Sequence, residues 1–301
     1  MGSKGSTTQI KEKASTKVAF GFIHIFFIIF SLSTIIPMIL TIIVSFTDEK
    51  AIIRNGYSFF PEEFSTTAYQ LILDQGWVLR AYLVTILVTV VGTLFCVIFS
   101  ALCAYAISLP SVKYRNIIAF YLFIPMIFNA GMVPWYLTVT QTLHLKNTFW
   151  ALVFPIIVQP FWVFLMRNYF KTIPPALTEA AEIDGAGKIY TFFKIVFPIA
   201  KPIVATIALF AALMYWNDYI MALWLIDKKE LYPLQYMLYQ IQSLIDFLTK
   251  GGAANMGINV VVPNESFIMA VFVVAMGPII LVYPFIQRYF VQGIVVGAVK
   301  G

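Results

Sequence analysis

Charged residues are scarce in this chain of 301 residues: only 11% are Asp, Glu, Lys or Arg, whereas 60% are hydrophobic. Soluble domains have about 25% charged and about 45–50% apolar residues. A soluble globule of this size could not hide so much apolar surface from water. The composition therefore excludes a disordered chain, argues against a soluble enzyme, and indicates that the excess apolar surface faces a lipid bilayer.

Cysteine and histidine are also rare, with two of each. Cys96 and Cys103 lie in one apolar run, where a helix places them about two turns apart, too far for a disulfide. His24 and His144 lie in different segments, so the sequence offers no Cys/His metal site. The net charge of +6 is not gathered into a basic patch, and a nucleic-acid partner is not expected.

The chain does contain six long apolar runs, at 18–46, 81–109, 116–139, 148–166, 199–225 and 265–289. A helix needs about 20 residues to cross the hydrocarbon core. The sequence therefore predicts an all-α polytopic membrane protein with six transmembrane helices. The expected parts are an N-terminal arm at 1–17, a transmembrane domain at 18–289, outer loops at about 47–80 and 226–264, and a tail at 290–301.

The basic residues indicate the orientation of these helices. Thirteen of the 20 Lys and Arg residues lie on one side: they fall in the arm, in the tail, in the loops after the second and fourth runs, and at the adjoining run ends, where Lys201 and Arg288 stand. The positive-inside rule places this side, and with it both termini, in the cytoplasm.

One cytoplasmic segment, at about 174–198, has the pattern of two short helices joined by a turn. Pro174 and Pro175 suit a helix start, and Gly185 suits a helix end because glycine readily takes a positive φ. Pro198 would end the second helix. Two uses remain open, packing against the chain's own helices or docking of a soluble partner, whereas an acid–base role for Glu179 lacks an accompanying nucleophile.

The residues of this segment resemble the EAA motif of ABC importer permeases. They are Glu179, Ala180, Ala181, Asp184, Gly185, Ala186, Ile195 and Pro198. The resemblance covers nearly the whole chain, and the end at Val299, Lys300 and Gly301 is similar to that of maltose-type inner membrane permeases. Residues 128–152 resemble one subgroup, the permeases for complex or acidic oligosaccharides such as pectin, rhamnogalacturonan or alginate fragments.

This resemblance implies a type I ABC importer permease fold in a bacterial plasma (inner) membrane. The implied partners are a second homologous permease, two ATPase subunits and an extracellular solute-binding protein that delivers an oligosaccharide. The motif residues would couple the chain to an ATPase subunit, and the tail residues Val299–Gly301 would reach toward the same subunits. ATP and Mg would be bound by the ATPases and no cofactor by this chain, whose Gly185-Ala186-Gly187-Lys188 lacks the spacing of a phosphate-binding loop.

Polar and aromatic residues within the apolar runs are candidates for the substrate path. Tyr215, Trp216, Asn217 and Asp218 lie in the fifth run, and Asn129, Trp135 and Tyr136 lie in or near the third. Intramembrane acids usually face a bundle interior or an aqueous cavity. Two other interpretations remain open, namely a polar cluster that bridges helices and an aromatic belt at the membrane interface.

Other classes of protein fit the sequence less well. An ion-coupled secondary transporter would need more intramembrane ionisable residues and usually an internal repeat. A membrane enzyme would show a nucleophile, metal ligands or a carboxylate dyad in the spans. A permease for a solute other than sugar remains the main alternative to a carbohydrate permease.

Overall fold

The computed structural model describes residues 14–74, 76–249, 265–278 and 280, and these form helices joined by turns. The elements are α1 (Ala14–Ser45), α2 (Glu49–Asn55), α3 (Thr67–Asp74), α4 (Trp77–Ser108), α5 (Arg115–Ile127), α6 (Met132–Leu137), η1 (Thr138–Thr142), η2 (Phe149–Leu152), η3 (Phe154–Ile156), α7 (Pro160–Phe170), α8 (Pro175–Ile183), α9 (Lys188–Thr191), η4 (Phe192–Val196), α10 (Phe197–Ile199), α11 (Lys201–Asn217), α12 (Ile220–Leu225), η5 (Lys229–Leu231) and α13 (Leu234–Thr249). A further apolar helix spans Glu265–Pro278. The expectation of a helical protein is confirmed for these residues.

The chain divides into two compact units, and one of them comprises residues 1–70 and 264–273. In this unit the carboxylate of Glu49 accepts hydrogen bonds from the backbone N–H groups of Glu265 and Ser266, each at 3.0 Å. These N–H groups have no partner within their own helix, and a carboxylate is favourable at the positive end of the helix dipole. The hydroxyl of Tyr57 donates to the Glu265 carboxylate at 2.8 Å. Glu49 and Tyr57 therefore hold the start of the Glu265–Pro278 helix.

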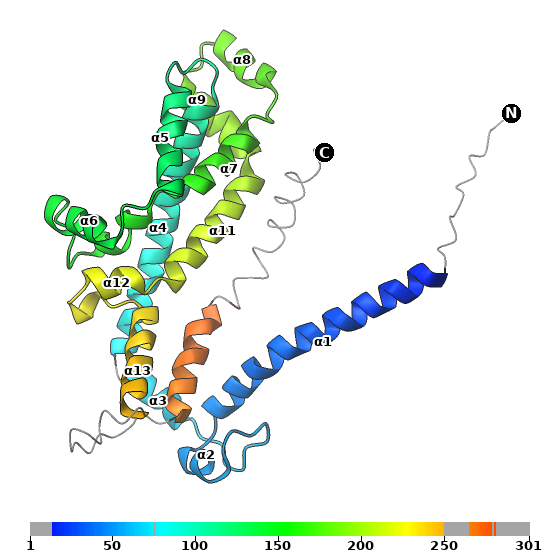
Figure 1. Cartoon of the computed structure of the whole chain (residues 1–301), viewed down its shortest axis with the longest axis vertical. Coiled ribbons are helices and arrows are strands. Elements are labelled where there is room, and N and C mark those ends of the chain that lie inside the picture. The colour runs from blue at the N-terminus through cyan, green and yellow to red at the C-terminus, as the bar shows by residue number, and fades with distance from the viewer. Residues whose placement is uncertain (1–13, 75, 250–264, 279, 281–301) are drawn as a thin grey trace. The chain divides into compact units, whose positions relative to one another are not determined.

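The second unit, residues 71–263 and 274–301, is built around α4. Helices α7 and α11 pack along α4, and α5 packs against both α4 and α7. Figure 1 shows α8 at one end of this bundle and α12 and α13 toward the other end. One apolar core joins α4, α7, η4 and the first half of α11, and a second joins α4, η2, α12 and the second half of α11.

Two helices are long and apolar enough to cross a membrane, Phe20–Ser45 within α1 and α4. Three bent pairs of helices pass the same criterion together, which gives up to five spans among the described residues. The sixth expected run, 265–289, is described only as far as the Glu265–Pro278 helix and residue 280. The structure thus shows the apolar helices but leaves the count of six a prediction. The Pro37 residue lies inside α1, which continues through it.

The third, fourth and fifth runs are not the single helices that their composition predicts. The fourth run divides into the short helices η2 and η3 and the longer α7, with a bend of 53° before α7. The third run divides into α5 and a stretch from Met132 to Thr142, bent by 119°. At this break Gly131 has a φ of +87°, which favours glycine. The fifth run divides at Asp218, where α11 ends in extended backbone and α12 begins two residues later. Apolar residues continue through the breaks in the third and fifth runs, so hydropathy alone does not reveal them.

Candidate functional site

The segment at 174–198 folds as a helical hairpin at one end of the α4 bundle. Helix α8 begins with Pro175, whose missing N–H costs nothing at a first helical position. Gly185 ends it with a φ of +80°, and the N–H of Ala186 then donates to the Ala181 carbonyl at 2.9 Å. Helix α9 follows from Lys188 and continues into η4. The predicted pattern of helix, turn and helix is confirmed.

Most of the predicted coupling residues gather on one face of this hairpin. A groove of about 620 Å³ is lined by Ala180, Ala181, Asp184, Gly185, Ala186 and Ile195, together with Leu177, Gly187 and Tyr190. The small alanine side chains and the glycines, which have none, leave room for another protein's side chains to approach the backbone. Ile183 is 87% exposed, and Leu177, Ile189 and Tyr190 of the same hairpin are exposed as well. Several exposed apolar side chains around one groove are typical of a surface that another protein covers.

Glu179 lies on the other face of α8. It lines a separate cavity of about 530 Å³ between α8 and the ends of α4, α5 and α7. Its side chain is exposed and makes no ion pair with any residue that the structure describes. The alanines and the glutamate of the motif therefore face two different spaces.

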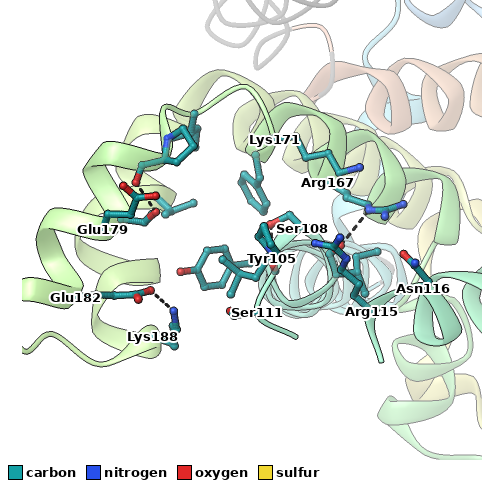
Figure 2. A pocket seen from close by; sticks show the side chains of 18 residues that line it. Tyr105, Ser108, Ser111, Arg115, Asn116, Arg167, Lys171, Glu179, Glu182 and Lys188 are labelled. Atoms are coloured by element: carbon teal, nitrogen blue, oxygen red, sulfur yellow. Dashed lines mark hydrogen bonds and ion pairs between the residues drawn. The ribbon is translucent and has the colours of Figure 1, made fainter. Parts of the chain in front are cut away.

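An ion pair joins the two limbs of the hairpin. The ammonium of Lys188, at the start of α9, lies against the carboxylate of Glu182 on α8. Figure 2 shows this pair on the α8 side of the cavity, with the Tyr105 ring of α4 extending toward it. The side chains of Phe192 and Val196 in η4 are buried in the core that α4, α7 and α11 share. The hairpin is therefore tied both within itself and to the bundle.

Pro198 is exposed in the short helix α10, which follows η4 directly and leads through Ala200 into α11. The prediction that Pro198 ends the second helix is therefore wrong, because a proline is tolerated in the first turn of a helix. The stretch Lys188–Ile199 meets α11 at 84°. The predicted coupling residues thus precede α11 directly. The tail residues Val299, Lys300 and Gly301, and the tail 290–301 as a whole, lie outside the described residues.

The four substrate-path candidates of the fifth run have different surroundings. Tyr215 is 2% exposed, and its hydroxyl donates to the Val153 carbonyl at 2.9 Å. Trp216 is 8% exposed and contacts Tyr82 edge to face, with no hydrogen-bond partner for its indole N–H among the described residues. Asn217 is exposed and accepts a hydrogen bond from Gln235 at 3.5 Å. Of these three residues, only Asn217 is open to solvent in this conformation.

Asp218 has a structural role that its position alone did not reveal. Its carboxylate accepts a hydrogen bond at 3.2 Å from the backbone N–H of Met221, in the first turn of α12. A short polar side chain at this place satisfies an N–H group that lacks a helical partner. The acid therefore stabilises the restart of the helix after the break.

The candidates of the third run lie around the 119° bend. The side-chain oxygen of Asn129 accepts from the Gly131 N–H at 2.8 Å, which closes a local turn. Trp135 packs edge to face against Trp224 of α12, with ring centres 5.5 Å apart. Tyr136 is half-buried beside the core of α4, α11 and α12. These contacts are local, so a substrate path through these residues stays a prediction.

A polar cluster of Lys146, Asn147 and Asp227 lies away from the hairpin, beside the end of α12. Asn147 has a φ of +60°, and its side-chain oxygen accepts from the N–H groups of Asp227 and Lys228. The Asp227 carboxylate accepts from the Asn147 amide and from Lys146, each at 3.1 Å. The hydrogen bond from Asn147, and then the contact with Lys146, lower the pKa of Asp227. This cluster fastens the segment after η1 to the end of α12.

Sequence reasoning missed the basic residues around the cavity and the tyrosine that faces it. Arg115, Arg167 and Lys171 line this cavity together with Tyr105. The sequence shows only that Arg115, Arg167 and Lys171 are positively charged, and this charge contributes to the predicted orientation of the helices. Their proximity depends on how α4, α5 and α7 pack, and no local pattern shows it.

Comparison with known proteins identifies the class of protein that has this architecture. A chain in the crystal structure of a bacterial ABC transporter involved in the import of the acidic polysaccharide alginate has the same fold, with a TM-score of 0.81 and 30% identity over 92% of this chain and 98% of that chain. The fold is therefore that of an ABC importer permease, with the helical hairpin before α11. The chain belongs to the family described as the inner membrane component of binding-protein-dependent transport systems, whose model matches residues 11–296.

Two curated relatives from Bacillus subtilis (strain 168) are also similar along most of their length. Protein LplC is 37% identical over 268 residues, which cover 89% of this chain and 90% of that protein. The polygalacturonan/rhamnogalacturonan transport system permease protein YtcP is 36% identical over 279 residues, covering 93% and 97%. The expected resemblance to sugar-type ABC permeases is confirmed, and so is the expectation of a transporter subunit in place of an enzyme.

Proposed function

We propose that this permease carries an oligosaccharide into a bacterial cell, in a complex powered by ATP hydrolysis on partner subunits. The observation that supports the cargo most directly is the similarity along nearly the whole chain to YtcP and to the alginate importer chain. Both of these proteins are named for acidic polysaccharides. An oligogalacturonide is therefore the first cargo to test.

The hairpin α8–α9 is the element that we propose as the contact with an ATPase subunit. The groove of Ala180, Ala181, Asp184, Gly185, Ala186 and Ile195 offers a small-residue surface with an exposed apolar rim. Glu179 supplies a carboxylate without an ion-pair partner among the described residues. A basic side chain of the ATPase would pair with this carboxylate. The hydrogen bond between them would be charge-assisted and therefore stronger than a neutral one.

The arrangement in the membrane is part of the same proposal. The chain would cross six times, with each bent pair counted as one span and the sixth span beginning at Glu265–Pro278. Both termini, the hairpin and the tail 290–301 would face the cytoplasm, and the segments 47–80 and 226–264 would face outward. The supporting observation is the excess of Lys and Arg in the inner segments.

The remaining partners follow from this arrangement. A second homologous permease would complete the translocation path, and membership of the binding-protein-dependent transport family supports this part of the proposal. Two ATPase subunits would hold ATP and Mg, and an extracellular binding protein would deliver the sugar to the outer mouth. Asn217, Trp216, Asp218, Tyr215, Asn129, Trp135 and Tyr136 remain the proposed path residues.

The test is a tagged copy of this chain, extracted from its host in mild detergent. Mass spectrometry should find a second permease and an ATPase pair with it. A deletion strain should lose uptake of oligogalacturonides, and the plasmid-borne gene should restore it. Recovery of the chain without an ATPase, in membranes that still transport, would reject ATP-driven import. Normal oligosaccharide uptake in the deletion strain, with loss of another solute, would reject the proposed cargo.

A further inference from the structure

The cavity behind α8 lies where α4 and α7 end and α5 begins. It is bounded by the last turn of α4, the first turn of α5, the last turn of α7 and one face of α8, and its volume is about 530 Å³ (Figure 2). Four cationic and two anionic side chains line it: Arg115, Arg167, Lys171, Lys188, Glu179 and Glu182. The wall of the cavity therefore carries a net positive charge.

Three of these cations have no anionic partner within the part of the chain that the structure describes. Lys188 is paired with Glu182, but no carboxylate of the described residues forms an ion pair with Arg115, Arg167 or Lys171. The Arg167 side chain is held in place because its Nε donates to the Ile107 carbonyl at 3.1 Å. This bond leaves its two terminal nitrogens free to donate. Arginine presents these groups as a planar fork that matches the geometry of a phosphate.

Tyr105 provides a second, independent observation that points to a ligand. Its side chain is 7% exposed and lines the cavity, yet its hydroxyl is buried and has no hydrogen-bond partner among the described residues. Figure 2 shows the ring reaching from α4 toward the α8 side of the cavity. A buried hydroxyl without a partner is costly. A ligand rich in oxygen would satisfy it.

The surroundings of the cavity favour a lipid as the source of that ligand. Helices α4, α5 and α7 are apolar, and Ile117, Phe120 and Tyr121 of α5 are exposed beside Arg115. Cations at the ends of apolar spans lie at the level of the phospholipid head groups. Basic pockets between spans on the cytoplasmic side are suited to anionic head groups, whose acyl chains then lie along the apolar helices.

We propose that this cavity binds the phosphate of an anionic phospholipid from the inner leaflet. Arg115, Arg167 and Lys171 hold the phosphate, and Tyr105 donates to the head group. The bound lipid lies between α8 and the bundle, so it supports the hairpin from behind. The assignment to the inner leaflet rests on the cytoplasmic orientation of the hairpin given under the proposed function, and it does not depend on the identity of the cargo.

The experiment compares the lipids retained by the full chain, purified with its co-purifying subunits. Nanodiscs containing equal amounts of phosphatidylglycerol and phosphatidylcholine are dissolved in mild detergent, and the retained lipid is counted by native mass spectrometry. We expect phosphatidylglycerol to be retained in preference to phosphatidylcholine. The double substitution Arg115→Gln with Lys171→Gln should lower that retention by about fivefold for each cation removed. Tyr105→Phe should lower it by about tenfold, because a hydrogen bond to a charged group is lost.

The matched control removes two cations that do not line the cavity. Lys113→Gln with Lys201→Gln changes the net charge by the same amount, and both lysines are exposed. Retention should stay at the wild-type level in this control. Equal retention of the two lipids by the wild type, or an equal loss in the control, would overturn the proposal. Replacing Arg115 and Lys171 breaks no ion pair among residues 14–74, 76–249, 265–278 and 280. Tyr105→Phe gives a second variant that keeps the buried ring.

A free phosphate ion is the other source of the same chemistry. It is tested in nanodiscs made of phosphatidylcholine alone, where inorganic phosphate is added and its phosphorus NMR line is followed. We expect no broadening that depends on Arg115 and Lys171. Broadening that disappears in the double substitution, without preferential retention of phosphatidylglycerol, would identify free phosphate as the ligand and overturn the lipid proposal. Neither readout involves transport, so a wrong cargo in the proposed function would leave both unchanged.

Discussion

Gly92 of α4 lies directly against the ring of Tyr215 on α11. A Cβ atom added at Gly92 would lie 2.6 Å from the Cζ atom of that ring. The ring cannot move away cheaply, because Tyr215 is 2% exposed and its hydroxyl is bonded to the Val153 carbonyl. The absence of a side chain at Gly92 therefore sets how closely α4 and α11 approach.

Gly92→Ala should destabilise the protein despite the better helix propensity of alanine. Overpacking of a close contact costs about 1–3 kcal/mol. The measurement is the thermal unfolding of the purified chain in detergent, with Gly21→Ala as the control, because no atom lies within 4 Å of a Cβ added there. An unchanged melting temperature for Gly92→Ala would contradict the close contact.

Gly185→Val should abolish uptake while the chain remains in the membrane. Gly185 has a φ of +80°, and a side chain in left-handed backbone costs about 1–2 kcal/mol. The turn between α8 and α9 would shift, and with it the groove. Membrane content by immunoblot and uptake of labelled oligosaccharide are the two measurements. Gly76→Val is the matched control, because Gly76 lies outside the groove, has a φ of −48° and leaves space for an added Cβ among the described residues. Equal loss of uptake in both variants would count against a special role of the turn.

Glu179→Lys should weaken the association with the ATPase subunits. A hydrogen bond between charged groups contributes about 1.5–3 kcal/mol, so its loss and replacement by a like charge should reduce co-purification by about tenfold or more. The yield of ATPase per tagged chain is the measurement. Glu230→Lys, an exposed change in η5, should leave it unaltered. Wild-type yield with Glu179→Lys would remove this residue from the proposed contact.

The cluster of Lys146, Asn147 and Asp227 should make stability depend on pH. The lowered pKa of Asp227 means that its stabilisation is fully present above the unfolded-state value of about 4 and is lost as the pH falls through the folded-state pKa. Wild type should therefore be more stable than Asp227→Asn at neutral pH, and the difference should vanish in acid. Melting temperatures of both proteins across this range are the measurement. Lys146→Gln should move the transition to higher pH, and a difference that stays constant with pH would contradict the assignment.

The features that the sequence predicted are those that depend on local chemistry. Prolines at 174 and 175 and the glycine at 185 determine where α8 begins and ends, and the apolar runs produce α1 and α4 almost at their expected bounds. The breaks at Gly131 and Asp218 were missed because apolar residues flank both of them. The cavity was missed because Tyr105, Arg115 and Arg167 come from three helices and meet only through their packing.

The near-perpendicular joint between the hairpin and α11 has a mechanical consequence. The stretch Lys188–Ile199 meets α11 at 84°, and Phe192 and Val196 anchor the inner part of this stretch in the core. A push along the axis of this stretch would therefore displace the first turn of α11 sideways, and α11 would tilt about its buried contact at Gly92 and Tyr215. The joint would thus convert a sliding movement of the hairpin into an angular movement of α11.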